Sequence, residues 1–222
     1  MKTTMPPIIT LDGPAGSGKG TLARRIATHL GYHLLDSGAL YRLTAIGAQH
    51  KNIALNDEAA LAHVAHHLQV RFTQTASGEE CILLDGADVT AQVRAETTGE
   101  LASQIAVLPA VRAALVALQH SFAQAPGLVA DGRDMGTVIF PHAPHKFFIT
   151  ASAAARAQRR YKQLQGLGVT ANLAQLEADI AERDHRDINR AAAPLKPADD
   201  AVLVDTSEMS IDEVVTLILS HL

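Results

Sequence analysis

Residues 13–21 read GPAGSGKGT and follow the apolar run IITL at residues 8–11, with only Asp12 between them. Four of these nine residues are glycines, which permit positive φ angles and let a turn point successive N–H groups into one concavity. Leu22, Ile26 and Leu30 then recur at helical spacing, so the concavity is expected at a helix N-terminus, where phosphate is favoured. The stretch therefore predicts a phosphate loop for a nucleoside triphosphate, formed by Gly13, Pro14, Ala15, Gly16, Ser17, Gly18, Lys19, Gly20 and Thr21.

Lys19 is the loop residue that can reach the outer phosphates of the nucleotide. The general phosphate-loop pattern has Ser or Thr directly after the lysine, whereas here Gly20 intervenes and Thr21 comes next. The alternative is a glycine-rich turn without a ligand. The order of strand, spaced glycines, lysine and helix favours the phosphate loop, but it does not say what happens to the nucleotide.

The composition is typical of a soluble globular protein with one domain. The chain has 222 residues, of which 47% are hydrophobic and 19% charged. Its single cysteine, Cys81, excludes an internal disulfide and a cysteine-based zinc site. We find neither an apolar run of about 18 residues, as a membrane helix needs, nor the apolar core of a secretory signal. A net charge of −4 argues against nonspecific nucleic-acid binding. We therefore expect a cytoplasmic protein with neither a membrane nor a nucleic-acid partner.

Strand and helix patterns alternate along the chain, which predicts an α/β fold. Helices are expected at residues 21–30, from 39, at 56–70, at 97–106 and from 109, and strands at residues 8–11, 32–35, 127–130, 146–149 and 201–204. The first two strands flank a crossover helix and should be parallel, with ligands bound beyond their carboxyl ends. Between residues 69 and 89, turn signals at 77–78 and 85–86 separate short apolar runs, which predicts a small antiparallel β insert.

Three charged residues leave the end of the third strand: Asp131, Arg133 and Asp134. An aspartate at the end of an apolar strand beside a phosphate loop is expected to hold Mg²⁺, often through water. The alternative for Asp131 is a turn-stabilising role before Gly132. Burying three charges requires compensating ligands, which makes a purely structural role less favoured.

A single helical stripe runs through residues 173–190. Steps of three and four place on it Leu173, Leu176, Ile180, Arg183, Asp187 and Arg190. The face begins apolar and ends with two arginines and an aspartate, so these can reach inward to phosphate if the helix continues that far. A frayed, solvated helix end is the alternative.

A second basic helix is expected upstream, where Arg156, Arg159 and Arg160 precede Gly166 and Gly168. Such a segment is suited to closing over a triphosphate, which excludes water as a competing phosphoryl acceptor. Solvated arginines on a helix surface are an equally open interpretation.

Taken together, the motifs resemble those of bacterial cytidylate kinase over essentially the whole chain. They are GPAGSGKGT, LLDSGALYR, ASQ at residues 102–104 with PAVR behind it, ADGRDMGT and ERDHRDINR. The GKGT loop is similar to that of nucleoside monophosphate kinases in general. The resemblance implies a three-layer fold around five parallel strands with helices on both faces. It implies one domain, 1–222, with a monophosphate-binding insert at about 38–108 and a short helical lid at about 153–172. ATP with Mg²⁺ is the implied donor, CMP or dCMP the acceptor, and CDP or dCDP the product.

The resemblance also assigns residues. Arg42, Arg133 and Arg190 match positions that hold the acceptor phosphate; Ser103, Arg112 and Asp134 match those facing cytosine; Ser37, Arg183 and Asp187 match sugar contacts. Arg156 and Arg160 would join the phosphate loop around ATP, and Lys19, Arg133, Arg190 and Asp131 would be catalytic. The chemistry agrees, because cytosine presents a 4-amino donor with N3 and O2 acceptors, which a carboxylate and an arginine read directly. Uracil would turn an oxygen toward Asp134 and bind less well.

Three alternatives remain open at this stage. The first is a monophosphate kinase for AMP or UMP. The second is a nucleotide-dependent switch, although no [NT]KxD guanine-reading motif is present. The third is a small-metabolite kinase such as a shikimate-type enzyme, which leaves the arginine–aspartate stripe unexplained. We expect a monomer.

Overall fold

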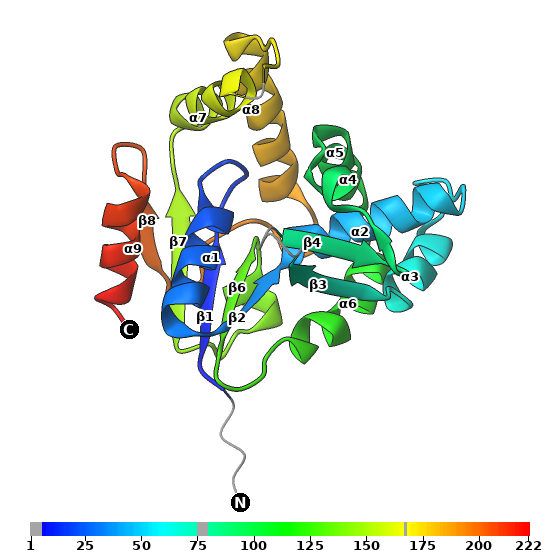
Figure 1. The fold of residues 1–222 in the computed structure, drawn as a ribbon, viewed down its shortest axis with the longest axis horizontal. Helices are drawn as coiled ribbons and strands as arrows, with labels where there is room; N and C mark the ends of the chain where they lie inside the picture. Colours follow the sequence, from blue (N-terminus) through cyan, green and yellow to red (C-terminus); the bar gives the residue numbers. More distant parts are fainter. Residues whose placement is uncertain (1–5, 75–79, 167) are drawn as a thin grey trace, which may run out of the picture. The chain divides into compact units, whose positions relative to one another are not determined.

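The computed structural model describes residues 6–74, 80–166 and 168–222, which form two compact units. Unit 1 comprises Met1–Asp36 and Ser121–Leu222, and unit 2 comprises Ser37–His120. Each unit has a sheet of its own, and Figure 1 shows the helices and strands of both.

Unit 1 is built on a parallel sheet of five strands in the order β2-β6-β1-β7-β8. The strands are β1 (Ile8–Asp12), β2 (His33–Asp36), β6 (Leu128–Gly132), β7 (His145–Thr150) and β8 (Val202–Asp205). All five predicted strands are confirmed; β6 extends two residues further toward its carboxyl end than predicted, and each of the other four extends one residue further. The polar residues that follow the apolar runs, such as Asp12 and Asp36, therefore belong to the strands themselves.

One face of this sheet carries the main core (Figure 1). The helices α1 (Lys19–Leu30) and α9 (Ile211–Leu219) pack there on alternate strand residues, among them Ile9, Leu11 and Phe147. Gly31 ends α1 in the left-handed region with φ 66°. A capping box of Ser210 and Glu213 opens α9.

The opposite face of the sheet is covered near β1 by a short π-helix, η1 (Met135–Ile139). Thr10 and Asp12 point to this side because their neighbours Ile9 and Leu11 face the core. Gly136 lies close enough to Thr10 that an added Cβ would be 2.8 Å from the Thr10 hydroxyl. Helices therefore cover both faces, as predicted, but the π-helix was not predicted.

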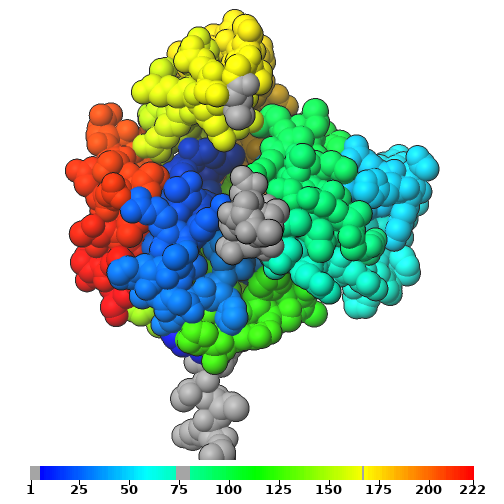
Figure 2. Space-filling view, viewed as in Figure 1, coloured from blue at the N-terminus to red at the C-terminus, as the bar shows by residue number. Residues whose placement is uncertain are grey.

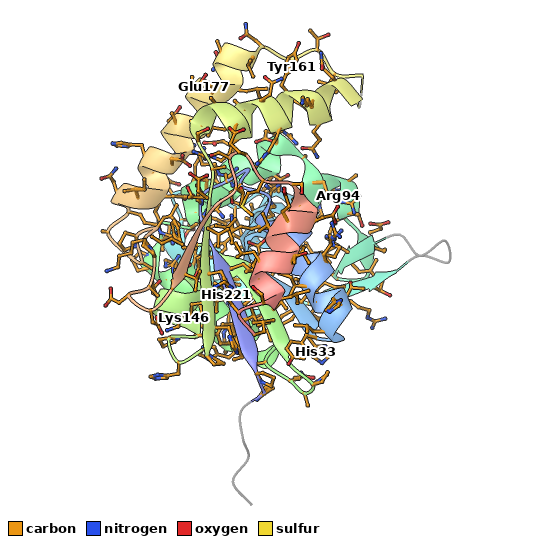
Figure 3. All side chains as sticks on the ribbon, turned by 90° about the vertical axis from the view of Figure 1, so that its left-hand side faces the viewer. His33, Arg94, Lys146, Tyr161, Glu177 and His221 are labelled. Atoms are coloured by element: carbon orange, nitrogen blue, oxygen red, sulfur yellow. The ribbon has the colours of Figure 1, made fainter. Side chains whose placement is uncertain are left out.

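The helices α7 (Ala153–Gly166) and α8 (Leu173–Asn189) follow β7 and pack against each other. They form the surface at the top of the view in Figure 2. Figure 3 shows Tyr161 on α7 and Glu177 on α8 at this end of unit 1, with Lys146 and His221 lower in the view. Asn172 caps α8 by accepting the Gln175 N–H at 3.1 Å. The basic helix and the long stripe-bearing helix are both confirmed as helices.

Unit 2 joins helices to an antiparallel sheet in the order β3-β4-β5. Its elements are α2 (Ser37–His50), α3 (Glu58–His66), β3 (Val70–Gln74), β4 (Glu80–Leu84), β5 (Ala87–Asp88), α4 (Thr90–Arg94), α5 (Glu96–Ile105) and α6 (Pro109–Ser121). The β insert is thus confirmed. Asp85 and Gly86 both have positive φ, 51° and 85°, as a tight hairpin turn requires. The turn predicted at residues 77–78 lies outside the described residues.

Several predicted boundaries in unit 2 were wrong. The helix expected to reach Val70 ends at His66, because Val70 pairs with Leu84 in the β insert. The helix expected from Ala39 begins at Ser37, and α4 was not predicted. Among the described residues no single helix has the length and hydropathy to cross a bilayer; α5 and α6 pass that test only together, by length and composition, across a 107° bend.

Candidate active site

The phosphate loop is shaped by glycines that no other residue can replace without strain. Gly13, Gly16 and Gly18 have φ of 146°, 75° and 91°. A Cβ on Gly13 would lie 1.9 Å from the Ile149 carbonyl oxygen of β7, which fixes the loop against the neighbouring strand. Gly18 is the N-cap of α1, so the loop leads directly into the helix N-terminus, as predicted.

Lys19 is buried within this loop, with 5% of its surface exposed. Its ammonium group donates to the Pro14 carbonyl at 2.8 Å and to the Ser17 hydroxyl at 3.4 Å. Burial lowers the pKa of Lys19, and the charge of Arg133 lowers it further, while Asp131 and Asp12 oppose the shift. A positive charge in this buried position is suited to binding an anionic ligand.

Carboxylates meet beside the loop at the ends of three adjacent strands. Asp36 and Asp131 are Cα partners in the β2–β6 register, and Asp12 ends β1. Burial is the main cause that raises the pKa of Asp131. The charge of Lys19 opposes this shift, and the like charge of Asp36 adds to it. A Cβ on Gly20 would lie 3.4 Å from Asp131 Oδ2, so the carboxylate packs over the residue that replaces the usual Ser or Thr.

These oxygen donors fit a hydrated divalent cation. Across the described residues, no three or more His, Cys, Asp or Glu side chains are grouped to hold a metal by themselves. Mg²⁺ is commonly bound through one or two carboxylates, with water and substrate phosphates as its other ligands. Asp131, with Asp36 beside it, is a donor set of that kind.

The carboxyl end of α8 brings arginines and aspartates of unit 1 together. Arg133 donates from Nε to Asp187 Oδ2 at 2.8 Å, and Arg190 Nη2 lies 3.4 Å from Asp134 Oδ1. Burial disfavours the charged form of Arg133, but Asp187 outweighs it and the pKa of Arg133 is raised. The helix ends at Asn189, so Arg190 follows it as an extended C-cap residue rather than continuing the helical stripe. Arg183 is half-buried on α8.

The arginines of α7 are engaged with the protein. Arg156, 4% exposed, donates from Nε to the Ala151 carbonyl at 2.9 Å and from Nη1 to the Ala15 carbonyl of the phosphate loop at 3.1 Å. It also forms a two-point ion pair with Asp184 of α8. The binding of ATP by Arg156 and Arg160 stays a prediction, since the structure shows Arg156 bracing the loop and Arg160 donating to Gln163 Oε1 at 2.7 Å.

Arg159, which is not among the residues assigned to ATP, holds the segment after β8. Its guanidinium donates to the side chain and the carbonyl of Thr206. Thr206 is itself buried, and its hydroxyl donates to the Thr150 carbonyl at 3.0 Å and the Ser17 carbonyl at 3.4 Å. Thr206 thus links the loop, β7 and α7.

Two assigned arginines of unit 2 donate hydrogen bonds to backbone carbonyls and a hydroxyl. Arg42 donates to the carbonyls of Val93 and Ala95 at 2.7 and 3.1 Å, with Gly99 packed against its guanidinium. Arg112 is buried and donates to the Tyr41 hydroxyl and the Ala106 carbonyl, both at 3.3 Å. These contacts fix the direction of both guanidinium groups.

Two serines in unit 2 have different surroundings. Ser37 donates to Gln119 Oε1 at 3.0 Å. Ser103 is buried, and its hydroxyl has no hydrogen-bond partner among the residues that the structure describes. An orphaned buried hydroxyl is the kind of group that a ligand satisfies.

Sequence reasoning missed four residues with defined roles in this geometry: Asp12, Asp184, Thr206 and Gln119. Asp12 and Asp184 had a usable signal, since one ends the first apolar strand and the other lies one helical turn before Asp187. Thr206 and Gln119 had none, because their partners are 47 to 189 and 82 residues away in the sequence.

The parallel sheet, the glycine-rich loop before α1, the buried lysine and the carboxylates at the strand ends define a phosphate-loop fold. The family model for cytidylate kinase matches residues 9–222. A cytidylate kinase of Burkholderia multivorans is 56% identical over 223 residues, covering 99% of this chain and 96% of that protein. One of Shewanella denitrificans is 53% identical over 216 residues, covering 97% and 95%. The chain belongs to the cytidylate kinase family.

The solved structures that the chain matches share little sequence with it. A gluconokinase from Sinorhizobium meliloti has a TM-score of 0.48 and 17% identity, covering 97% of this chain and 91% of that chain.

Proposed function

We propose that the protein transfers the γ-phosphoryl group of ATP to CMP or dCMP, giving ADP and CDP or dCDP. The observation that supports this most directly is the set of buried charges in unit 1. Lys19, Asp134 and Arg190 are each less than 10% exposed. Burying such charges does not by itself favour folding. An anionic ligand pair explains why they are kept.

In this proposal each group of residues has one task. The phosphate loop and Lys19 bind the phosphates of ATP and stabilise charge on the transferring group. Arg133 and Arg190 hold the acceptor phosphate in line and offset repulsion between the two anions. The acceptor oxygen attacks the γ-phosphorus and ADP leaves, so no protein nucleophile is needed. Arg42 of unit 2 is assigned to the same acceptor phosphate.

Base recognition is assigned to Asp134, Arg112 and Ser103. Asp134 would accept from the 4-amino group of cytosine, while Arg112 donates to its acceptors. The unsatisfied hydroxyl of Ser103 supports a polar ligand at that residue. The remaining polar contacts, to the sugar, are assigned to Ser37, Arg183 and Asp187.

Mg²⁺ bound with ATP would supply positive charge between the phosphates, and Asp131 would hold it through water. The buried, raised-pKa carboxyl of Asp131 beside Asp36 supports that assignment, because a cation relieves the like-charge repulsion. We further propose one functional domain over residues 1–222, with an acceptor-binding insert at about 38–108 and a lid at about 153–172. The protein would act as a monomer in the cytoplasm, with no membrane or nucleic-acid partner.

A coupled assay of ADP release with four acceptors tests the proposal. CMP and dCMP should support rapid release of ADP, and the rates with UMP and AMP should be much lower. Faster turnover with UMP or AMP would identify a different monophosphate kinase. Slow release of ADP that no monophosphate changes would instead support the nucleotide-dependent switch.

A further inference from the structure

Asp12 is the last residue of β1 and directly precedes the phosphate loop. Its carboxylate is 5% exposed and points to the face of the sheet that η1 covers. Oδ1 accepts the N–H of Met135 at 2.8 Å, and Oδ2 accepts the N–H of Gly136 at 2.7 Å. Both oxygens therefore hold a segment more than 120 residues away in the sequence.

The segment held by Asp12 carries two of the residues assigned to the acceptor nucleotide. Arg133 and Asp134 lie between the end of β6 and the start of η1. The Asp134 carbonyl accepts the N–H groups of Val138 at 2.9 Å and Ile139 at 3.1 Å, which closes the π-turn. The backbone of this turn is consequently attached to β1 at Met135 and Gly136.

Close packing shows that the attachment leaves little freedom. A Cβ on Gly136 would lie 2.8 Å from Thr10 Oγ1 and 3.3 Å from Asp12 Oδ2. A Cβ on Gly132 would lie 2.8 Å from the Met135 side chain, which is fully buried. Glycines at both positions therefore permit the approach that brings two N–H groups to one carboxylate.

The charge on Asp12 is costly to keep in this place. Burial raises its pKa to about 6, the two backbone hydrogen bonds oppose that shift, and the nearby charges of Asp134 and Lys19 act in opposite directions. An uncharged residue would avoid the burial cost. A carboxylate, however, is the side chain that can accept from two N–H groups at once without presenting a donor.

We propose that Asp12 is a positioning residue that fixes Arg133 and Asp134 relative to the phosphate loop and so sets recognition of the acceptor nucleotide. This inference rests on the proposed function, because it assumes that Arg133 and Asp134 bind the monophosphate. Asp12 acts through the backbone of the turn. Loss of the Asp12 carboxylate should therefore weaken binding of the acceptor nucleotide more than binding of ATP.

Three variants separate this role from a general packing role. Asp12→Asn keeps the shape but turns an NH₂ group toward one of the two N–H donors. Gly136→Ala disturbs the same contact from the η1 side without changing a charge. Thr10→Val is the matched control, since Thr10 is the neighbouring side chain on the same face of the sheet. The Thr10 hydroxyl has no hydrogen-bond partner among the described residues.

Amide hydrogen exchange and steady-state kinetics on the full chain provide the test. In Asp12→Asn and Gly136→Ala, exchange at Met135 and Gly136 should accelerate while exchange in β7 is unchanged. The KM for CMP should rise about 10-fold, as expected for a lost hydrogen bond to a charged group. The ratio of kcat/KM for CMP over UMP should fall, while the KM for ATP should stay close to that of the parent protein. Thr10→Val should match the parent protein in all of these measurements.

Any of three results would overturn the inference. The first is faster exchange with an unchanged KM for CMP and an unchanged CMP-to-UMP ratio, which would make the contact purely structural. The second is unchanged exchange in both variants, and the third is a KM for ATP that rises as much as that for CMP. A parent protein that does not phosphorylate CMP would refute the proposed function instead, and the exchange result would still report on the contact.

Discussion

Two glycine-containing turns follow the adjacent strands β1 and β6, and they use glycine differently. In the phosphate loop, Gly13, Gly16 and Gly18 have positive φ, so the backbone itself adopts a shape that can bind phosphate. The second turn, residues 132–136, has glycines whose missing Cβ atoms permit close packing against Met135, Thr10 and Asp12. Its side chains, Arg133 and Asp134, carry the assigned recognition.

The difference has a consequence for how each turn is kept in shape. The first turn adopts its shape through its own φ angles and the helix it leads into, and Arg156 and Thr206 add contacts to its backbone. The second depends on partners from other segments: Asp12 for its backbone, Asp187 for Arg133, and Arg190 for Asp134. Changes in the first turn should therefore affect the chemistry or the fold as a whole, whereas changes in the second should affect selectivity.

The largest effect is expected for Lys19→Ala in the first turn. Removing the buried charge that stabilises the transferring group should lower kcat by about 10²- to 10³-fold, the range seen for the loss of one electrostatic stabiliser. The measurement is kcat for CMP at saturating ATP. Lys51→Ala, an exposed lysine after α2, is the control and should leave kcat unchanged. Equal turnover in Lys19→Ala and the control would remove Lys19 from the catalytic assignment.

Gly13→Ala should be the most damaging to folding. Its Cβ would lie 1.9 Å from the Ile149 carbonyl oxygen, so the strand or the loop must move. We expect the free energy of unfolding to fall by more than about 3 kcal/mol, by analogy with overpacking and backbone strain combined. Urea denaturation provides the measurement.

Gly31→Ala is the matched control for this prediction. Gly31 also has positive φ, 66°, but a Cβ there would meet nothing within 4 Å. The free energy of unfolding of Gly31→Ala should therefore fall by only about 1–2 kcal/mol, the cost of the left-handed conformation for alanine. Equal losses in the two variants would show that contact with β7 does not constrain the loop.

Asp12, which joins the two turns, should make stability depend on pH. Its folded pKa of about 6 lies above the ordinary 3.8, so between these values the folded protein holds a proton that the unfolded chain has lost. Its contribution to stability is therefore greatest below about pH 4 and falls as pH rises through 6. Relative to Asp12→Asn, the stability of the parent protein should decrease by up to about 3 kcal/mol over that window. A difference that stays constant from pH 4 to 7 would contradict this account.

The smallest effect is expected for Asp134→Ala in the second turn. Losing the carboxylate that reads the 4-amino group should lower the ratio of kcat/KM for CMP over UMP by about 10-fold, with a smaller change in kcat. Asp212→Asn is the control, because Asp212 is exposed on α9, which packs on the face of the sheet opposite to η1. A CMP-to-UMP ratio that does not change would sink the role of Asp134 in base selection.

The same contrast explains how much could be predicted from the sequence. The first turn is a local pattern, so its glycines, Lys19 and the start of α1 could be predicted within two residues. The five strands were predictable because short apolar runs end in polar residues. The motif resemblance then supplied the acceptor residues, whose assignments stay predictions.

The second turn could be predicted only in part. Its charges were visible, but the π-helix was not, because Gly136 is required by contact with Thr10 rather than by a turn signal. The end of α3 was misjudged for a similar reason, since residues 67–70 continue a helical pattern until Val70 pairs with Leu84. The contact of Arg156 with Ala15, 141 residues away, has no local signature either, and its binding of ATP stays a prediction. In each case tertiary contact outweighed local preference.

Transfer of a labelled phosphoryl group from ATP to CMP distinguishes a CMP kinase from an ATP-hydrolysing protein. The protein is incubated with ATP labelled at the γ-phosphate and with CMP, and the nucleotide products are separated. We expect the label in the β-phosphate of CDP, with one labelled phosphoryl group transferred for each ADP formed, and negligible release of label without CMP. Label recovered as inorganic phosphate at a rate that CMP does not change would contradict this expectation.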